Sequence, residues 1–253
     1  MNSNIRVIQS IQRAIDIINC FNQSKPTLSI NEISKELSLH INTTRGIINT
    51  LVYNGYLRHD PIENKYSLGL VFIPKAELVN TNSVDRIKEI VRTYLYEIAN
   101  KYEVSSRLQL ISRQKIFTVD TVNPENSRYI LLTRMDTPFP LNATSSGKLY
   151  LYYTNEEERE KYLNNINPIK FTDKTIIHRD ELEKELKFIG LNGYSIEKEE
   201  IGLGISSIAV PLMDSTDTFI GTLSITATNA IIEKVHKDVL FDMKKASDEI
   251  KSL

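Results

Sequence analysis

Apolar residues in the first part of the chain recur at helical spacing in three short segments. Ile11, Ile15 and Ile18 predict a first helix, which Lys25-Pro26-Thr27 ends. Ser29, with a glutamate three residues later, predicts the capped start of a second helix. A third helix is predicted over 42–54, with a glycine as its C-terminal stop. Two short helices joined by a tight turn form a helix-turn-helix unit.

The third predicted helix has one apolar side and one side rich in amides and hydroxyls. Thr44, Ile48 and Leu51 share the side that must face a core. Polar side chains on the other side can read base edges, because Asn pairs with adenine and Arg with guanine. The predicted DNA-reading residues are Asn42, Thr43, Arg45 and Asn49.

The segment that follows the third helix predicts two strands, 56–59 and 66–69, around an Asp60-Pro61 turn. A hairpin after a recognition helix is the wing of a winged helix. Arg58 and Lys65 are then the predicted contacts to the DNA backbone. Three-helix units with a hairpin also serve as protein-interaction or dimerisation modules, so the pattern alone leaves that alternative open.

The rest of the chain mixes helical and strand patterns and is interpreted as an α+β domain. It favours one antiparallel sheet with helices on one face, and a small molecule can bind between the other face and the loops. We place the DNA-binding domain at 1–75, a linker at 76–83 and the larger domain at 84–253. Strands are predicted at 107–111, 115–122, 129–132, 193–198, 204–212 and 219–227, and helices from Val84, Ser145, Thr154, Leu182 and Ile231.

Composition and charge narrow the class of protein. The 253 residues are 41% hydrophobic and 25% charged, which is ordinary globular usage, and the net charge of −1 excludes a histone-like binder. The first 75 residues carry +3 and the remainder −4, which has the sign expected if the first part meets phosphate. Because affinity for duplex DNA grows with the number of neutralised phosphates, so modest a charge favours a dimer with two half-site readers.

Candidate cofactor and membrane signals are weak. The lone Cys20 and four scattered histidines predict neither a disulfide framework nor a metal site. No apolar run approaches the ~20 residues that span a bilayer, and the start of the chain lacks the features of a signal peptide. We therefore expect a soluble cytoplasmic protein without metal or cofactor.

Tests for catalytic motifs leave one alternative. Gly202-Leu203-Gly204 lacks the third glycine of a dinucleotide fingerprint, and Gly147-Lys148 lacks the rest of a P-loop. Ser145 and Lys148 match the Ser-x-x-Lys nucleophile motif of penicillin hydrolases, although its companion motifs are missing. A hydrolase or transferase with an appended winged helix stays an alternative. The same helix start, with its serines and free N–H groups, is also a ready anion site.

These residues together resemble the IclR-type bacterial transcriptional regulators. The matching stretches are 28–34 through 55–57, 65–69, 138–148, 175–176 and 193–211, in the order of the family. The resemblance implies a winged-helix reader, a linker helix, a GAF-like effector domain, and dimers or dimers of dimers. It implies a small-molecule effector, such as an organic or aromatic acid, in a pocket lined by Leu131, Leu141, Ser145, Ser146, Glu197, Ile205, Ser207, Ser224 and Thr226.

Departures from the family pattern refine that expectation. Serines stand at 145 and 146 where the family has small Gly or Ala, and Ser207 replaces a common Cys, so the pocket favours a polar or anionic ligand. Glu197 would repel an anion unless another group offsets it. Pro74 is expected to interrupt the linker helix. Gly46 costs a helix about 1 kcal/mol relative to Ala, and the sequence leaves open whether it permits close approach to DNA.

The sequence thus predicts a ligand-responsive, non-enzymatic DNA-binding regulator. We expect it to be a repressor that binds an inverted-repeat double-stranded DNA operator. A regulator that has lost its ligand and works only through DNA or protein contacts is a further alternative.

Overall fold

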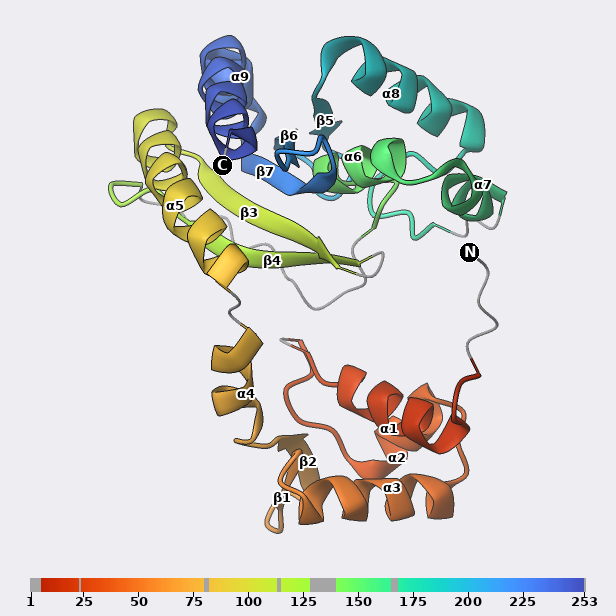
Figure 1. Ribbon diagram of the computed structural model, residues 1–253. Coiled ribbons are helices and arrows are strands. Elements are labelled where there is room, and N and C mark those ends of the chain that lie inside the picture. Colours follow the sequence, from red (N-terminus) through yellow and green to blue (C-terminus); the bar gives the residue numbers. More distant parts are fainter. Residues whose placement is uncertain are drawn as a thin grey trace. The chain divides into compact units, whose positions relative to one another are not determined.

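The computed structural model describes residues 6–22, 24–79, 82–112, 115–127, 140–164 and 168–252 (Figure 1). The chain divides into two compact units, the first ending at Thr81 and the second beginning at Asn82. The first unit holds the three predicted helices and the predicted hairpin. Its elements are α1 (Gln9–Asn19), α2 (Ile30–Glu36), α3 (Ile41–Tyr53), β1 (Leu57–Asp60), β2 (Lys65–Leu68) and α4 (Phe72–Val79).

Local signals set the ends of the helices in the first unit. Ser29 Oγ accepts the backbone N–H of Glu32 at 3.3 Å, and the Glu32 carboxylate accepts the backbone N–H of Ser29 at 2.7 Å. This reciprocal capping box satisfies two N–H groups that the helix itself cannot pair. The α3 helix ends with Asn54 as its C-cap, and Gly55 follows with a left-handed φ of 75°.

A small apolar core joins the helices to the hairpin. It consists of Ile17, Cys20, Phe21, Leu28, Ile33, Ile48, Leu51 and Leu57. β1 and β2 pair antiparallel, and the residue before the capping box, Leu28, bridges to Tyr66 of β2. The hairpin is thereby fixed to the helix-turn-helix.

The expectation that Pro74 interrupts the linker helix is wrong. α4 begins at Phe72, so Pro74 lies in its first turn. The first four N–H groups of a helix have no intrahelical partner, so a proline there breaks no hydrogen bond.

The second unit is an α+β domain around one antiparallel sheet. Its five strands lie in the order β4-β3-β7-β6-β5. The predicted strand at 129–132 lies outside the described residues. The elements are α5 (Asn82–Tyr102), β3 (Ser105–Ser112), β4 (Lys115–Val122), α6 (Ser145–Tyr153), α7 (Glu156–Asn164), α8 (Arg179–Asn192), β5 (Ser195–Lys198), β6 (Ile205–Met213), β7 (Phe219–Thr228) and α9 (Asn229–Lys251).

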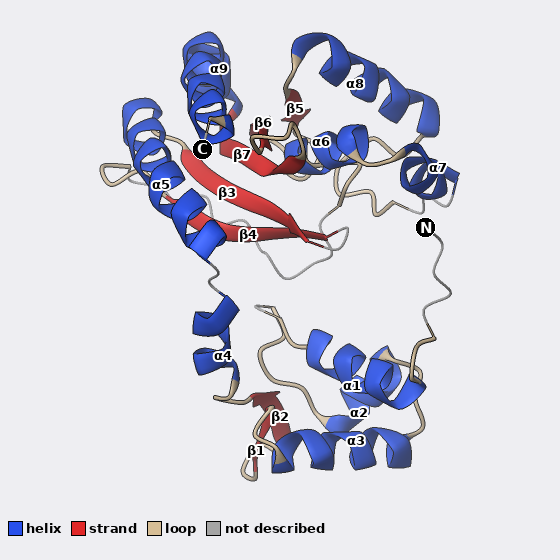
Figure 2. Cartoon of the chain, in the orientation of Figure 1, coloured by secondary structure: helices blue, strands red, loops and turns tan. Residues whose placement is uncertain are grey.

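Helices cover both faces of this sheet, which corrects the expectation of a single covered face (Figure 2). Ile208, Val210 and Leu212 of β6 join the large core formed with α5 and α9. Ala209, between them, joins a second core formed with α6 and α8. Successive residues of a strand point to opposite faces, so a strand buried throughout requires a layer on each side.

The expected cap of the helix near Thr154 is displaced by one residue. Thr154 is the C-cap of α6, and its hydroxyl donates to the Glu158 carboxylate. The N–H of Glu158 donates instead to Asn155 Oδ1 at 2.8 Å. Both residue types cap helices well, so the sequence pattern does not distinguish them.

Replacing Ser29 with Ala should destabilise the first unit by about 1 kcal/mol, because the capping box loses its acceptor. Hydrogen exchange of α2 amides in the full chain measures this loss. Ser10→Ala is the matched control, since Ser10 is an exposed serine in the first turn of α1 but is not its N-cap. Equal protection in the two variants would contradict the assignment.

Candidate functional site

The face of the sheet beneath α6 carries buried polar side chains. They come from four neighbouring strands, and the serines at the start of α6 lie against them. These residues are Gln109 of β3, Ser224 and Thr222 of β7, Ser207 of β6, Glu197 of β5, and Ser145 and Ser146 of α6. We call this set the polar face.

One half of the polar face is a hydrogen-bonded chain that ends on a carboxylate. Ser145 Oγ and Ser207 Oγ lie 2.9 Å apart, and Ser207 Oγ donates to Glu197 Oε2 at 3.0 Å. Glu197 Oε1 accepts the N–H groups of Glu200, at 2.6 Å, and Ile201, at 3.3 Å. Burial raises the pKa of the Glu197 carboxyl, while these hydrogen bonds oppose that rise. Glu197 thus joins the site to the turn after β5.

The other half converges on one amide oxygen. Gln109 Oε1 accepts the hydroxyls of Ser146 at 2.5 Å, Thr222 at 3.0 Å and Ser224 at 3.0 Å. Two residues earlier on β3, and so on the same face, Arg107 is 5% exposed. Its Nη1 donates to Thr226 Oγ1 at 2.8 Å, and burial lowers the pKa of its guanidinium. Arg107 therefore brings a cationic side chain to this face.

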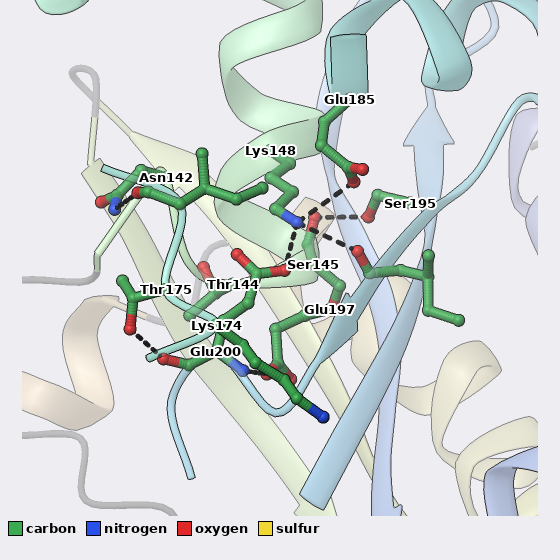
Figure 3. Close-up of polar contacts among 12 residues, drawn as sticks. Asn142, Thr144, Ser145, Lys148, Lys174, Thr175, Glu185, Ser195, Glu197 and Glu200 are labelled. Atoms are coloured by element: carbon green, nitrogen blue, oxygen red, sulfur yellow. Dashed lines mark hydrogen bonds and ion pairs between the residues drawn. The ribbon is translucent and has the colours of Figure 1, made fainter. Parts of the chain in front are cut away.

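Lys148 lies beside Ser145 and Glu197 of this site (Figure 3). Its side chain is completely buried. Its Nζ donates to Glu200 Oε1 at 2.5 Å, to Glu185 Oε2 at 3.1 Å and to the carbonyl of Ile196 at 3.2 Å. These acceptors engage all three ammonium protons. Burial raises the pKa of Glu200, and the charge of Lys148 opposes that rise.

This arrangement does not support the Ser-x-x-Lys alternative. Ser145 Oγ is hydrogen-bonded to Ser207 Oγ. The Lys148 ammonium instead donates to the carboxylates of Glu185 and Glu200 and to a backbone carbonyl. A general base needs a free lone pair within reach of the nucleophile, and a fully engaged ammonium has none.

Close packing at the start of α6 depends on Gly147. A Cβ atom there would lie 2.5 Å from Leu141 Cα and 2.6 Å from Thr144 Oγ1. Thr144 is the N-cap, and its hydroxyl accepts the Gly147 N–H at 3.1 Å. The missing side chain lets the 141–144 turn pack directly against the helix start, which sets the positions of both serines.

The structure brings together most of the ligand residues expected from the sequence. Five of them belong to the polar face: Ser145, Ser146, Glu197, Ser207 and Ser224. Thr226 is half-buried and accepts a hydrogen bond from Arg107. Ile205 is half-buried at the start of β6. Leu141 packs against the second core. Leu131 lies outside the described residues.

Sequence reasoning missed Gln109 and Thr222 of the polar face and the neighbouring Arg107, and it considered Lys148 only as part of a nucleophile motif. The alternation Arg107-Leu108-Gln109-Leu110 was a usable signal, because it places two polar side chains on one face of β3.

The expected DNA-reading residues form an exposed surface on the first unit. Asn42, Thr43, Arg45 and Asn49 are exposed on α3, while Thr44, Ile48 and Leu51 are buried on its other side. Arg45 Nη1 donates to Asn42 Oδ1 at 3.3 Å. On the hairpin Arg58 is exposed, and Lys65 Nζ lies 3.9 Å from a carboxylate oxygen of Glu63.

The described residues form neither a membrane-spanning helix nor a metal-binding cluster. In the ranges described above, no helix is long and apolar enough to cross a bilayer. Among the same residues, no three His, Cys, Asp or Glu side chains form a group that could hold a metal ion.

A helix-turn-helix with an exposed amide-rich helix, followed by a domain with a buried polar face, defines the class of DNA-binding transcriptional regulators with an effector domain. The IclR helix-turn-helix domain matches residues 10–61, and the bacterial transcriptional regulator IclR C-terminal domain matches residues 80–252. The chain belongs to the IclR family of bacterial transcriptional regulators.

Relatives are similar over nearly their whole length. The HTH-type transcriptional regulator XynR of Escherichia coli K12 is 26% identical, over 90% of this chain and 89% of XynR. The glycerol operon regulatory protein of Streptomyces coelicolor is 27% identical, over 87% and 85%. An IclR-type regulator structure from Silicibacter sp. TM1040 has the same fold, with a TM-score of 0.85, 15% identity and coverage of 96% and 95%.

Changing Glu197 to Gln should alter how stability depends on pH. Burial raises the folded-state pKa of Glu197, so its stabilising contribution is complete below the ordinary value of 4.5 and is lost as pH rises through the raised value. Gln can keep the backbone and Ser207 contacts without ionising. The variant should therefore gain stability relative to the parent protein as pH rises from about 4 to about 8.

Thermal unfolding at several pH values measures this difference, and Glu181→Gln, an exposed position on α8, is the control. A stability difference between the Glu197 variant and the parent that stays constant with pH would refute the role given to burial.

Proposed function

We propose that the protein represses transcription in the cytoplasm as a dimer on an inverted-repeat operator, with α3 in the major groove. The main support is the row of exposed amide and guanidinium groups on α3, which lies opposite a buried apolar side of the same helix. The first 75 residues carry only a small positive charge, so one DNA-binding domain would bind weakly, which favours a dimer with two such domains. Two relatives, the transcriptional repressor IclR and the HTH-type transcriptional repressor AllR of Escherichia coli K12, are 22% and 25% identical.

Arg45→Ala should weaken specific DNA binding by about 1–3 kcal/mol, because a guanidinium that reads a base edge is lost. The probe is a fragment enriched from genomic DNA by the parent protein at fixed ~0.15 M salt, with fluorescence anisotropy as the readout. Lys187→Ala, which removes an exposed cation from α8, is the control. Unchanged affinity of the Arg45 variant would exclude this role, and an enriched sequence without two-fold symmetry would exclude the dimer arrangement.

We infer that a small polar or anionic effector binds at the polar face. Ser145, Ser207 and Ser224 supply hydroxyls, and the start of α6 supplies the positive end of a helix dipole. The nearby Lys148 offsets the charge of Glu197, which would otherwise repel an anion, and Arg107 supplies a second cation on the same face. An IclR homologue from Microbacterium hydrocarbonoxydans, solved with 4-hydroxybenzoate, has the same fold, with a TM-score of 0.77, 18% identity and coverage of 96% and 98%.

Ser207→Ala should weaken effector binding about fivefold, since one hydrogen bond contributes about 1 kcal/mol. Thermal shifts with a panel of small hydroxy acids and their amides identify a ligand, and its titration gives the affinity. Ser206→Ala is the matched control, because Ser206 is the neighbouring serine on the opposite face and donates to Asn229 Oδ1 at 2.6 Å. Equal weakening in both variants would place the ligand elsewhere.

A further inference from the structure

Gly46 lies in the middle of the exposed side of α3, where a glycine is unfavourable. It is the sixth of the 13 residues of the helix, and it is exposed. Glycine inside a helix is disfavoured relative to every other residue except proline, because it loses the most backbone freedom on folding. A glycine at such a position needs a reason.

The fold does not supply that reason. Apart from its chain neighbours and the backbone of its own helix, a Cβ atom built on Gly46 would have no described heavy atom within 4 Å, so alanine would fit without a clash. The backbone of Gly46 is ordinary right-handed helix, which any residue adopts. Thr50 Oγ1 does donate to the Gly46 carbonyl at 3.0 Å, but every residue type offers that carbonyl.

The neighbours of Gly46 are residues that can contact bases. Asn42 is one turn before it, and Asn49 and Tyr53 follow at helical spacing on the same side. All three are exposed, and Tyr53 is 90% exposed. The missing side chain thus leaves a notch, with an amide before it and an amide after it.

We propose that Gly46 is the point of closest approach between α3 and DNA. The notch admits the edge of a base pair, such as a thymine methyl group, against the bare helix backbone. Asn42 and Asn49 then reach the bases on either side, at a depth that a methyl group at position 46 would prevent. This inference rests on the proposed function, in which α3 lies in the major groove.

The test compares Gly46→Ala with the parent protein on the DNA fragment enriched from the genome. Alanine should raise the thermal unfolding midpoint of the first unit, because it favours the helix. It should also weaken DNA binding about tenfold, because the added methyl holds α3 away from the bases. Opposite effects on stability and affinity separate lost contact from lost folding. Gln12→Ala, at an exposed position of α1, controls for a general change in helix stability.

Each outcome decides the proposal. If Arg45→Ala loses affinity and Gly46→Ala does not, α3 reads DNA but Gly46 is not the point of closest approach. If neither variant loses affinity, the placement of α3 in the groove fails as well. If Gly46→Ala lowers the unfolding midpoint, the fold itself requires the glycine and the inference is overturned. A second selection of genomic fragments by the alanine variant should show altered preference at one base pair of each half-site.

Discussion

The second unit is organised around a buried charge. Lys148 has no exposed surface, and removing an ammonium ion from water is so costly that it persists only where acceptors surround it. Glu185 of α8, Glu200 after β5 and the carbonyl of Ile196 in β5 supply them. One side chain of α6 therefore holds a second helix, an edge strand and a turn. Removal of any one acceptor would leave that charge partly uncompensated, so a single substitution among these residues would be destabilising.

The turn that holds Lys148 also holds the polar face. The backbone N–H of Glu200 donates to Glu197, which accepts from Ser207, and Ser207 contacts Ser145 at the start of α6. Lys148 is one turn further along the same helix and contacts Glu200 in turn, so the contacts lead from α6 through the sheet and the turn back to α6. The large apolar core of the sheet, by contrast, lies on the face toward α5 and α9. The large apolar core and the polar face thus lie on opposite faces of the same strands.

Features with local causes were predictable from the sequence. The capping box of α2 and the two sides of α3 follow from residues three or four positions apart. The family resemblance supplied the polar-face serines and Glu197. The bonds of Gln109 were not predictable, because two of its three donors lie more than 100 residues away in the chain. Pro74 was misjudged because the start of α4 carries no cap signal. The second covered face was missed because buried polar residues such as Ser207, Thr222 and Ser224 give their strands the pattern of half-buried ones.

Hydroxyls rather than bare backbone form much of the polar face. A hydroxyl rotates about one bond and can either donate or accept, whereas an amide N–H can only donate. Three hydroxyls already share one oxygen of Gln109, so one of them can turn away while two hydrogen bonds to that oxygen remain. Hydroxyls of the polar face can thus change from donor to acceptor without any movement of the backbone. For the effector that we propose to bind here, such a surface suits recognition of several chemically related molecules.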